Sequence, residues 1–377
     1  MLQLPSLGFL EPADLGHQEN QSDCQTGGEH AAGEILQHFV ERRGQFYAGG
    51  ISSPVTAPSS CSRLSAHLAF GTISIRRVWQ ATEQRRSEVK GFAMTEKNQS
   101  IQKQFRRWQK SIQSMQSRLH WHCHFIQKLE DEPAIEHRNM WSAANGLREN
   151  DFSDRHFQAW KSGCTGYPLV DACMRSLNKT GWLPFRMRAL VVSFASYSLW
   201  LHWRDPGIHL AKSFLDFEPG IHWSQMQMQS GTTGINTLRI YNPTKQAKEQ
   251  DPQGTFIRKW IPELVSVPNV FIHTPWMMPA HIQQSSDCTI GSLYPKPIVD
   301  HTHALRQAKS RFTELRQDKK ARNAACAVAV RHGSRRDRRG AMRQDQERKN
   351  LQKKQVVDQR RDSDAAEKQA LLPFAYD

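Results

Sequence analysis

The sequence predicts an all-α, multi-helical protein, and two observations carry this prediction. Apolar residues recur at intervals of three and four over long stretches, as they do on the buried face of a helix. Few segments alternate apolar and polar residues in the manner of strands, and no internal repeat is evident. Apolar residues concentrate before about residue 300. We therefore expect a helical body followed by a basic, partly disordered C-terminal extension.

The N-terminal part divides into a leader and three helix starts. Residues 1–27 are polar, rich in glycine and glutamine and without periodicity, so they are expected to be a leader or linker. A first helix is expected near Gly28, followed by a loop of Gly, Pro and Ser. Further helices are expected to open at Ser65 and near Ile73, where the Ser74 hydroxyl can cap the chain.

The middle of the chain predicts its longest helices. Residues 96–130 fit one or two long helices, and Pro168 opens a helix that closes before Gly181. Another begins at Pro184 and runs to about Leu201; it is apolar nearly all round, so it should be buried. Beyond Pro297 one helix to about Val330 is expected. The domain expectation is a helical domain over 28–303 and a basic helix with a disordered tail over 304–377.

The charge of the chain favours a polyanionic partner. The net charge is +15, and from His301 onward 20 Lys and Arg residues stand against 10 Asp and Glu residues. Nucleic acid is the commonest polyanion, although a solvated basic tail without a ligand is an equal alternative. The seven cysteines form no CxxC pair and no apolar run reaches membrane-spanning length. A reducing, cytoplasmic setting is therefore expected, with no membrane contact.

Residues 60–65, SCSRLS, place several hydroxyl groups and one guanidinium at an expected helix start. Backbone amides, hydroxyl groups and the helix dipole all favour an anion there, so a phosphate group can dock. An ordinary N-cap at Ser65 explains the same pattern equally well.

Several motifs together resemble the FAD-binding helical domain of the photolyase/cryptochrome family. They are CSRLSAHLAFGTISIRRV, TGYPLVDACMRSLNKTGW, RMR, RIYNPTKQ, DPQGTFIRKWIPEL and YPKPIVDH. The resemblance covers about 28–303 with the motifs in the family's order. Because about 27 residues precede this region, the family's N-terminal α/β antenna domain, which holds a second chromophore, is expected to be absent.

The resemblance implies an FAD site. Arg188 and Asp216 would face the isoalloxazine ring as a buried ion pair, although a pair that only ties two helices together is the alternative. Cys61 stands where the family commonly has Thr. The residues expected to hold the cofactor are Tyr47, Ser62, Arg63, Leu64, Ser65, Met115, Arg118, His122, Arg188, Asp216, Phe217 and Glu218.

The chain departs from the family around the reactive part of the flavin. The asparagine that usually faces the reactive nitrogen falls at His222, or at Gly220 if the alignment slips by two. Arg118 replaces an acid that normally bonds the damaged pyrimidine, whereas Trp121 is kept as an aromatic wall for a flipped base. His120 and His124 lie one helical turn apart, yet packing explains them better than a metal site does.

The family's chain of tryptophans is only partly present. Trp203 matches its middle member, but the flavin-proximal member falls at Met226 and the outermost has no equivalent, although Trp141 and Trp160 lie upstream. An alternative electron route would pass through Trp182, Trp200 or Trp223, for which core packing is the simpler interpretation. Trp203, Trp182 and His222 are the candidate catalytic residues.

Three functions follow from the resemblance. The first is a photolyase, in which light-excited reduced FAD passes an electron to a pyrimidine dimer in UV-damaged DNA; a monomer is expected. The second is a cryptochrome-like light receptor that signals through its tail, and the third a non-catalytic remnant. The candidate DNA contacts are Trp121, Phe185, Arg186, Lys245, Arg258, Lys259 and the basic tail.

Overall fold

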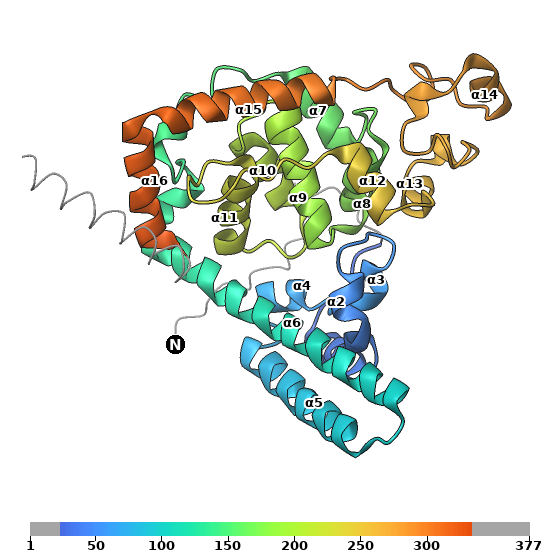
Figure 1. Ribbon diagram of the computed structural model, residues 1–377, viewed down its shortest axis with the longest axis vertical. Coiled ribbons are helices and arrows are strands. Elements are labelled where there is room, and N and C mark those ends of the chain that lie inside the picture. Colours follow the sequence, from blue (N-terminus) through green and yellow to red (C-terminus); the bar gives the residue numbers. More distant parts are fainter. Residues whose placement is uncertain (1–22, 334–377) are drawn as a thin grey trace, which may run out of the picture.

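The computed structural model describes residues 23–333, and over this range the fold is all-α (Figure 1). No β-strand occurs within these residues; the one extended pairing is an isolated bridge between Ile290 and Tyr294. The expected leader to residue 22 and the expected tail beyond residue 333 lie outside the described residues. The same residues contain no helix long and apolar enough to cross a membrane.

The N-terminal helices form a small layer against the long helix α6. Leu36, Phe39, Leu64 and Leu119 belong to the apolar cluster that joins these helices. The first helix begins at Glu29, as expected from Gly28. The elements of this layer are α1 (Glu29–Glu41), η2 (Arg43–Phe46), α2 (Tyr47–Gly50), α3 (Ala57–Ser60), α4 (Ser65–Ala69), α5 (Ile75–Thr95) and α6 (Gln99–Asp131).

Helices α5 and α6 form an antiparallel hairpin that projects from the body (Figure 1). The Ser74 hydroxyl accepts a hydrogen bond from the Arg77 N–H, which caps α5 as its sequence predicts. The Asn98 side chain accepts bonds from the N–H groups of Ser100 and Ile101 and so starts α6. The prediction for 96–130 is realised as one unbroken helix of 33 residues.

The buried centre is built by α8 (Pro168–Thr180) and α9 (Phe185–Ser193). Gly181 ends α8 in the left-handed region, at φ 65°, as predicted. The helix expected to reach Leu201 is shorter as an α-helix. It changes at Phe194 into a π-helix, η5 (Phe194–Ser198), in which the Leu199 N–H bonds to the Phe194 carbonyl five residues earlier.

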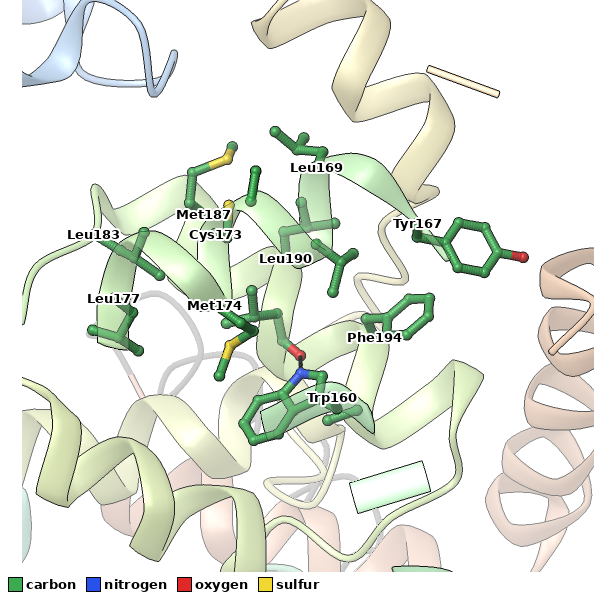
Figure 2. Close-up of a cluster of buried hydrophobic side chains, with 14 of the residues drawn as sticks. Trp160, Tyr167, Leu169, Cys173, Met174, Leu177, Leu183, Met187, Leu190 and Phe194 are labelled. Carbon is green, nitrogen blue, oxygen red and sulfur yellow. Dashed lines mark hydrogen bonds between the residues drawn. The ribbon is translucent and has the colours of Figure 1, made fainter. Parts of the chain in front are cut away.

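The main core gathers side chains from α8, α9 and the segments beside them. Figure 2 shows these side chains around the Trp160 indole, whose Nε1 donates to the Val191 carbonyl at 3.1 Å. Most of the cluster is fully buried, so its apolar area supplies a large part of the folding free energy. Its labelled members are Trp160, Tyr167, Leu169, Cys173, Met174, Leu177, Leu183, Met187, Leu190 and Phe194.

The remaining helices surround this core. Short 3₁₀ segments lie at η3 (Pro133–Glu136), η4 (Ser142–Ala144), η6 (Pro262–Leu264) and η7 (Pro275–Met277). The α-helices are α7 (Asp154–Ser162), α10 (Arg204–Ser213), α11 (Pro219–Ser230), α12 (Pro243–Gln250), α13 (Thr255–Trp260), α14 (Ala280–Ser285), α15 (His301–Gln317) and α16 (Lys319–His332).

The single helix expected after Pro297 is wrong in one respect, because it is broken in two. Asp318 takes an extended conformation between α15 and α16, and its carboxylate accepts a hydrogen bond from the Ala321 N–H at 2.7 Å. An aspartate competes with the helix backbone and favours an N-cap, which explains the break. In Figure 1, α16 turns away from α15 and reaches the C-terminal end of α6.

Helix α15 is attached to the body through a buried arginine. The Arg148 guanidinium lies 4.5 Å from the Trp200 ring centroid and 5.2 Å from that of Phe312 on α15. Its Nη1 donates to the Ser230 carbonyl, whereas Nε and Nη2 have no partner. Burial lowers the pKa of Arg148 to about 10, so the side chain stays charged at neutral pH.

Candidate functional site

An inner cavity of about 250 Å³ lies between the N-terminal layer and the central helices. Its walls come from α2, the loop before α4, α9, α10 and α11. The expected cofactor residues among its lining are Tyr47, Ser62, Arg63, Ser65, Arg188, Asp216, Phe217 and Glu218, together with Trp182 and His222. The fold therefore gathers residues that are up to 182 positions apart in the sequence around one space.

One end of the inner cavity is strongly cationic. Arg43, Arg63, Arg118 and Arg188 all lie near enough to Cys61 to favour its thiolate, yet burial dominates and raises the pKa of Cys61 to about 11. The thiol is therefore neutral, and the four guanidinium groups near it outnumber the two carboxylates of the inner lining, Asp216 and Glu218. Such a field suits the phosphate groups of a ligand.

Arg63 is held in position by its neighbours. Its backbone adopts φ 60°, and its guanidinium stacks 4.0 Å from the Trp182 ring centroid. Its Nε donates to Gln25 Oε1, while Gln25 Nε2 donates to the Arg63 carbonyl. The helix expected to open at Ser65 does so, as α4, and the alternative of Ser65 as its N-cap is wrong, because Leu64 takes that place without a side-chain cap. The Ser65 side chain instead hydrogen-bonds to the Asp216 carboxylate.

Arg188 and Asp216 form the expected pair. Arg188 Nη2 lies 2.8 Å from Asp216 Oδ2, its Nε donates to the Leu183 carbonyl, and its guanidinium stacks 4.1 Å from the Phe214 ring centroid. Burial would raise the pKa of Asp216, but Arg188 and Ser65 outweigh it and hold that pKa below its ordinary value. The second carboxylate oxygen, Oδ1, is buried and without a partner, so the pair leaves one acceptor free for a ligand.

His222 is the residue that faces this cavity, whereas Gly220 does not. A Cβ at Gly220 would lie 2.7 Å from the Ile126 Cα, so this position packs on α6. His222 Nε2 bonds to the Gly207 carbonyl at 2.9 Å, which requires the proton on Nε2. Burial lowers the pKa of His222 to about 4, so a neutral imidazole lines the cavity at neutral pH.

Glu218 lines the inner cavity and is also the N-cap of α11. Its carboxylate accepts hydrogen bonds from the N–H groups of Gly220 and Ile221 and thereby caps α11. This cap fixes the face of α11 that carries Gln225, Met226 and Gln229 into the cavity. Gln225 and Gln229 were not predicted as site residues. They follow Ile221 at successive intervals of four, a spacing that places all three on one face of a helix.

A wider outer cavity of about 780 Å³ adjoins the inner one. The two share part of their lining, including Tyr47, Phe185, Arg188 and Asp216. The expected residues Met115, Arg118, Trp121 and His122 line only the outer cavity, as do Phe125, Lys128, Met228, Arg239 and His332. Trp121 is 47% exposed, so a large aromatic surface stands open at the mouth.

His122 supplies a second unsatisfied polar atom. Burial lowers its pKa while Glu218 opposes that shift, and its Nδ1 is buried with no partner. The Arg118 guanidinium lies 5.6 Å from the Phe185 ring centroid, across the outer cavity. No cluster of three metal-ligating side chains occurs within residues 23–333, and His120 and His124 contact Trp79 and Trp121 instead.

The tryptophans divide into two groups. Trp203 is fully buried and lines neither cavity, but its ring centroid lies 6.0 Å from that of Trp223, which lies 4.7 Å from His222. Trp223 thus connects Trp203 with the cavity wall. Trp141, Trp160 and Trp200 line neither cavity; Trp200 contacts Phe312 and two arginines.

Several candidate residues lie away from both cavities. Leu64 is buried in the N-terminal cluster, and Arg186 Nη1 donates to Gln246 Oε1 at 3.4 Å. Among the candidate phosphate contacts, Lys245 pairs with Glu249 at 3.8 Å. The Arg258 guanidinium donates hydrogen bonds to the Val267 carbonyl and to Asn269 Oδ1. The Lys259 ammonium lies 5.3 Å from the Trp260 ring centroid.

The comparisons with known proteins agree with this geometry. The family model described as the FAD binding domain of DNA photolyase matches residues 115–314. A deoxyribodipyrimidine photo-lyase of Alkalihalophilus pseudofirmus is 30% identical over 76% of this chain and 55% of its own length. Cryptochrome-2 of Arabidopsis thaliana is 32% identical over 75% of this chain and 45% of its own.

A solved structure gives the same result. The crystal structure of a class III photolyase from Agrobacterium tumefaciens superposes with a TM-score of 0.68 at 28% identity, covering 79% of this chain and 58% of that one. This chain therefore spans about half the length of the curated relatives it matches.

The residues present fit FAD. The Arg63 guanidinium in the inner lining, with Arg43 and Arg118 nearby, suits its diphosphate. The free acceptor on Asp216 and the unpartnered Nδ1 of His122 belong to the lining of the joined cavities, where a polar ring system would satisfy them. The fold, this lining and the match over more than half of the chain lead to one conclusion. The chain belongs to the photolyase/cryptochrome family and carries its FAD-binding domain.

Proposed function

We propose that the protein is a photolyase that uses FAD and light to split pyrimidine dimers in UV-damaged DNA. The observation that carries this proposal is the outer cavity. It joins the FAD cavity, is wide enough for a flipped-out pyrimidine dimer, and has the exposed face of Trp121 at its mouth. FAD, when bound, supplies light absorption and the electron that is transferred.

The chain's own residues position and enclose the reacting groups. Trp121 offers a stacking surface for an unstacked base, and Phe185 and Met228 supply apolar walls. Arg118, Lys128 and Arg239 surround the same cavity with positive charge, which suits a phosphate backbone at its rim. The neutral His222 imidazole lies on the inner side, where it holds its proton on Nε2 against the Gly207 carbonyl.

The experiment is a repair assay with FAD-loaded protein, an external thiol reductant and a duplex containing one cyclobutane dimer or one (6-4) product. Light-dependent loss of either lesion supports the proposal, and no loss of both refutes it. Trp121→Ala should weaken binding of the damaged duplex by about 1 to 3 kcal/mol, the usual cost of one lost aromatic–base stack. Trp79→Ala, on the preceding helix, is the matched control, because Trp79 lines neither cavity.

A second candidate function is a cryptochrome-like light receptor. The observation that favours it is that His332, at the end of α16, lines the outer cavity and is hydrogen-bonded to the Glu132 carboxylate. A C-terminal segment that touches the flavin-side cavity is placed to respond to a change there. Light-dependent proteolytic cleavage after His332 without dimer loss would favour the receptor, whereas dimer loss would favour the photolyase. A protein that retains no FAD would be the non-catalytic remnant.

A further inference from the structure

The hairpin of α5 and the first half of α6 carries a strong positive charge. Residues 75–112 contain ten Lys and Arg residues against three Glu residues, a net charge of +7. This segment projects from the body of the molecule (Figure 1). Self-repulsion on a projecting hairpin destabilises it, so the excess charge requires a reason beyond the fold.

The three carboxylates of the hairpin are already engaged. Glu83 pairs with Arg86 at 2.6 Å and Glu88 pairs with Arg85 at 3.0 Å. The Glu96 carboxylate accepts a hydrogen bond from the Asn98 N–H. The other eight cations are exposed and form no ion pair with any residue of the range 23–333: Arg76, Arg77, Lys90, Lys97, Lys103, Arg106, Arg107 and Lys110.

Three of these cations lie on the same face of α6 as residues that line the outer cavity. Lys103, Arg107 and Lys110 precede Ser114, Arg118 and Trp121 at intervals of four, three, four, four and three, so all six lie on one side of the helix. Ser114, Arg118 and Trp121 line the outer cavity. The cationic stripe, defined as Lys103, Arg107 and Lys110, therefore extends in line from the mouth of that cavity.

The length of this face is close to that of a short DNA flank. The 18 residues from Lys103 to Trp121 span about 27 Å at 1.5 Å per residue. Successive phosphate groups of one strand are about 3.4 Å apart along the duplex axis, so the face covers roughly eight base pairs. The exposed apolar side chains Phe92, Met94 and Ile101 lie near the turn of the hairpin, and Ile101 is on the side of α6 away from the stripe.

We propose that the cationic stripe binds the phosphate backbone of duplex DNA on one side of the lesion, roughly four to eight base pairs away. This inference rests on the proposed function for the position of the lesion, but backbone binding itself requires no light and no chemistry. A linear row of cations of one sign, spaced one helical turn apart, matches a polyphosphate strand. It adds affinity that is independent of base sequence.

The test is equilibrium binding in the dark by FAD-loaded, full-length protein, with the triple variant Lys103→Gln, Arg107→Gln, Lys110→Gln. The matched control is Lys161→Gln, Lys179→Gln, Lys212→Gln, which removes the same charge from exposed positions on α7, α8 and α10 that line neither cavity. Both sets replace exposed helical side chains with a good helix former, and circular dichroism and thermal unfolding verify the fold. The probes are a dimer-containing 24-base-pair duplex and two shorter duplexes, each trimmed to three base pairs on one side of the dimer.

For the long duplex, the triple variant should bind about 10- to 100-fold more weakly than the wild type near 0.15 M salt. The magnitude of its negative slope of log K against log salt should be smaller by about 2 to 3. For one trimmed duplex, and only one, wild type and variant should bind alike. The proposal is overturned if the control loses as much affinity as the variant, or if the loss persists with both trimmed duplexes. It is also overturned if the variant binds DNA normally but loses affinity for vesicles rich in phosphatidylserine.

The outcome separates this inference from the proposed function. If the triple variant shows the smaller salt slope but the wild type repairs no dimer in light, the stripe stands and the photolyase proposal fails. If the wild type repairs dimers and the variant keeps the full salt slope, the stripe fails alone. At saturating DNA the variant should repair at the wild-type rate, because none of the three residues lines either cavity.

Discussion

Asp216→Ala should release FAD from an otherwise folded protein. The substitution leaves the Arg188 guanidinium, 25% exposed on its side chain, without its only carboxylate, and removes the free acceptor Oδ1. Breaking a fully buried ion pair costs about 3 to 5 kcal/mol. Arg188 keeps its bond to the Leu183 carbonyl and its contact with Phe214, and it is partly hydrated. We therefore expect a smaller loss of stability, about 2 to 3 kcal/mol. The missing acceptor Oδ1 should cost about 1.5 to 3 kcal/mol of FAD binding, which is a roughly 10- to 150-fold weaker affinity.

The assay is titration of apoprotein with FAD by flavin fluorescence, supported by the flavin-to-protein absorbance ratio after gel filtration. Asp171→Asn is the matched control. Asp171 is also a buried carboxylate, but it serves Thr165, Gly166 and Tyr294 and lines neither cavity. The control should lose stability and keep its FAD affinity. Wild-type FAD affinity in folded Asp216→Ala would show that this pair does not face the cofactor.

The same carboxylate predicts a pH dependence. Because the pKa of Asp216 is lowered on folding, the ion pair stabilises the protein above the unfolded value of about 3.9, and this contribution is lost as pH falls through the folded value. Between about pH 2 and pH 5, the Tm of the wild type should therefore fall more steeply with decreasing pH than that of Asp216→Asn. Equal slopes for the two proteins would contradict this account.

Three further predictions concern the core and the electron route. Trp223→Phe should slow light-driven reduction of bound FAD by an external thiol, whereas Trp200→Phe should not, because only Trp223 connects Trp203 with the cavity wall; transient absorption measures both. The pKa of His222 is lowered to about 4, so the unfolded state takes up the proton first and the wild type loses up to about 3 kcal/mol of stability as pH falls from 6.5 toward 4. His222→Asn should abolish this loss, and urea unfolding at pH 5 and pH 7 tests it. Gly166→Ala should destabilise the fold by roughly 3 kcal/mol or more in urea unfolding, because Gly166 has φ 80° and an added Cβ would lie 2.4 Å from the Lys296 backbone; a loss below 1 kcal/mol would show that this contact relaxes.

The sequence predicts the helices well where local chemistry decides them. Pro168 and Gly181 bound α8, and Ser74 caps α5, because proline, glycine and serine act within one turn. The change to a π-helix at Phe194 was not predictable, since no proline or glycine marks it and the packing around it decides.

In the candidate site, too, motifs in the sequence predict some residues, whereas tertiary packing decides others. Motif order identifies Arg188 and Asp216, and their 2.8 Å contact then arises from two segments 28 residues apart. The alternative of Ser65 as an N-cap failed because the same hydroxyl has a tertiary neighbour, Asp216, that local spacing cannot reveal. The alternatives His222 and Gly220 are separated only by the close approach of Gly220 to α6, which depends on the packing of two helices.

The burial of Arg148 has a consequence for the order in which the molecule opens. Its guanidinium stays charged in an aromatic enclosure that Phe312 closes, and two of its nitrogens have no partner. Detachment of α15 and α16 would return that charge to water, which offsets part of the apolar area exposed. These two helices should thus open at a lower free energy than α8 and α9, with amide protons that exchange well before those of these core helices.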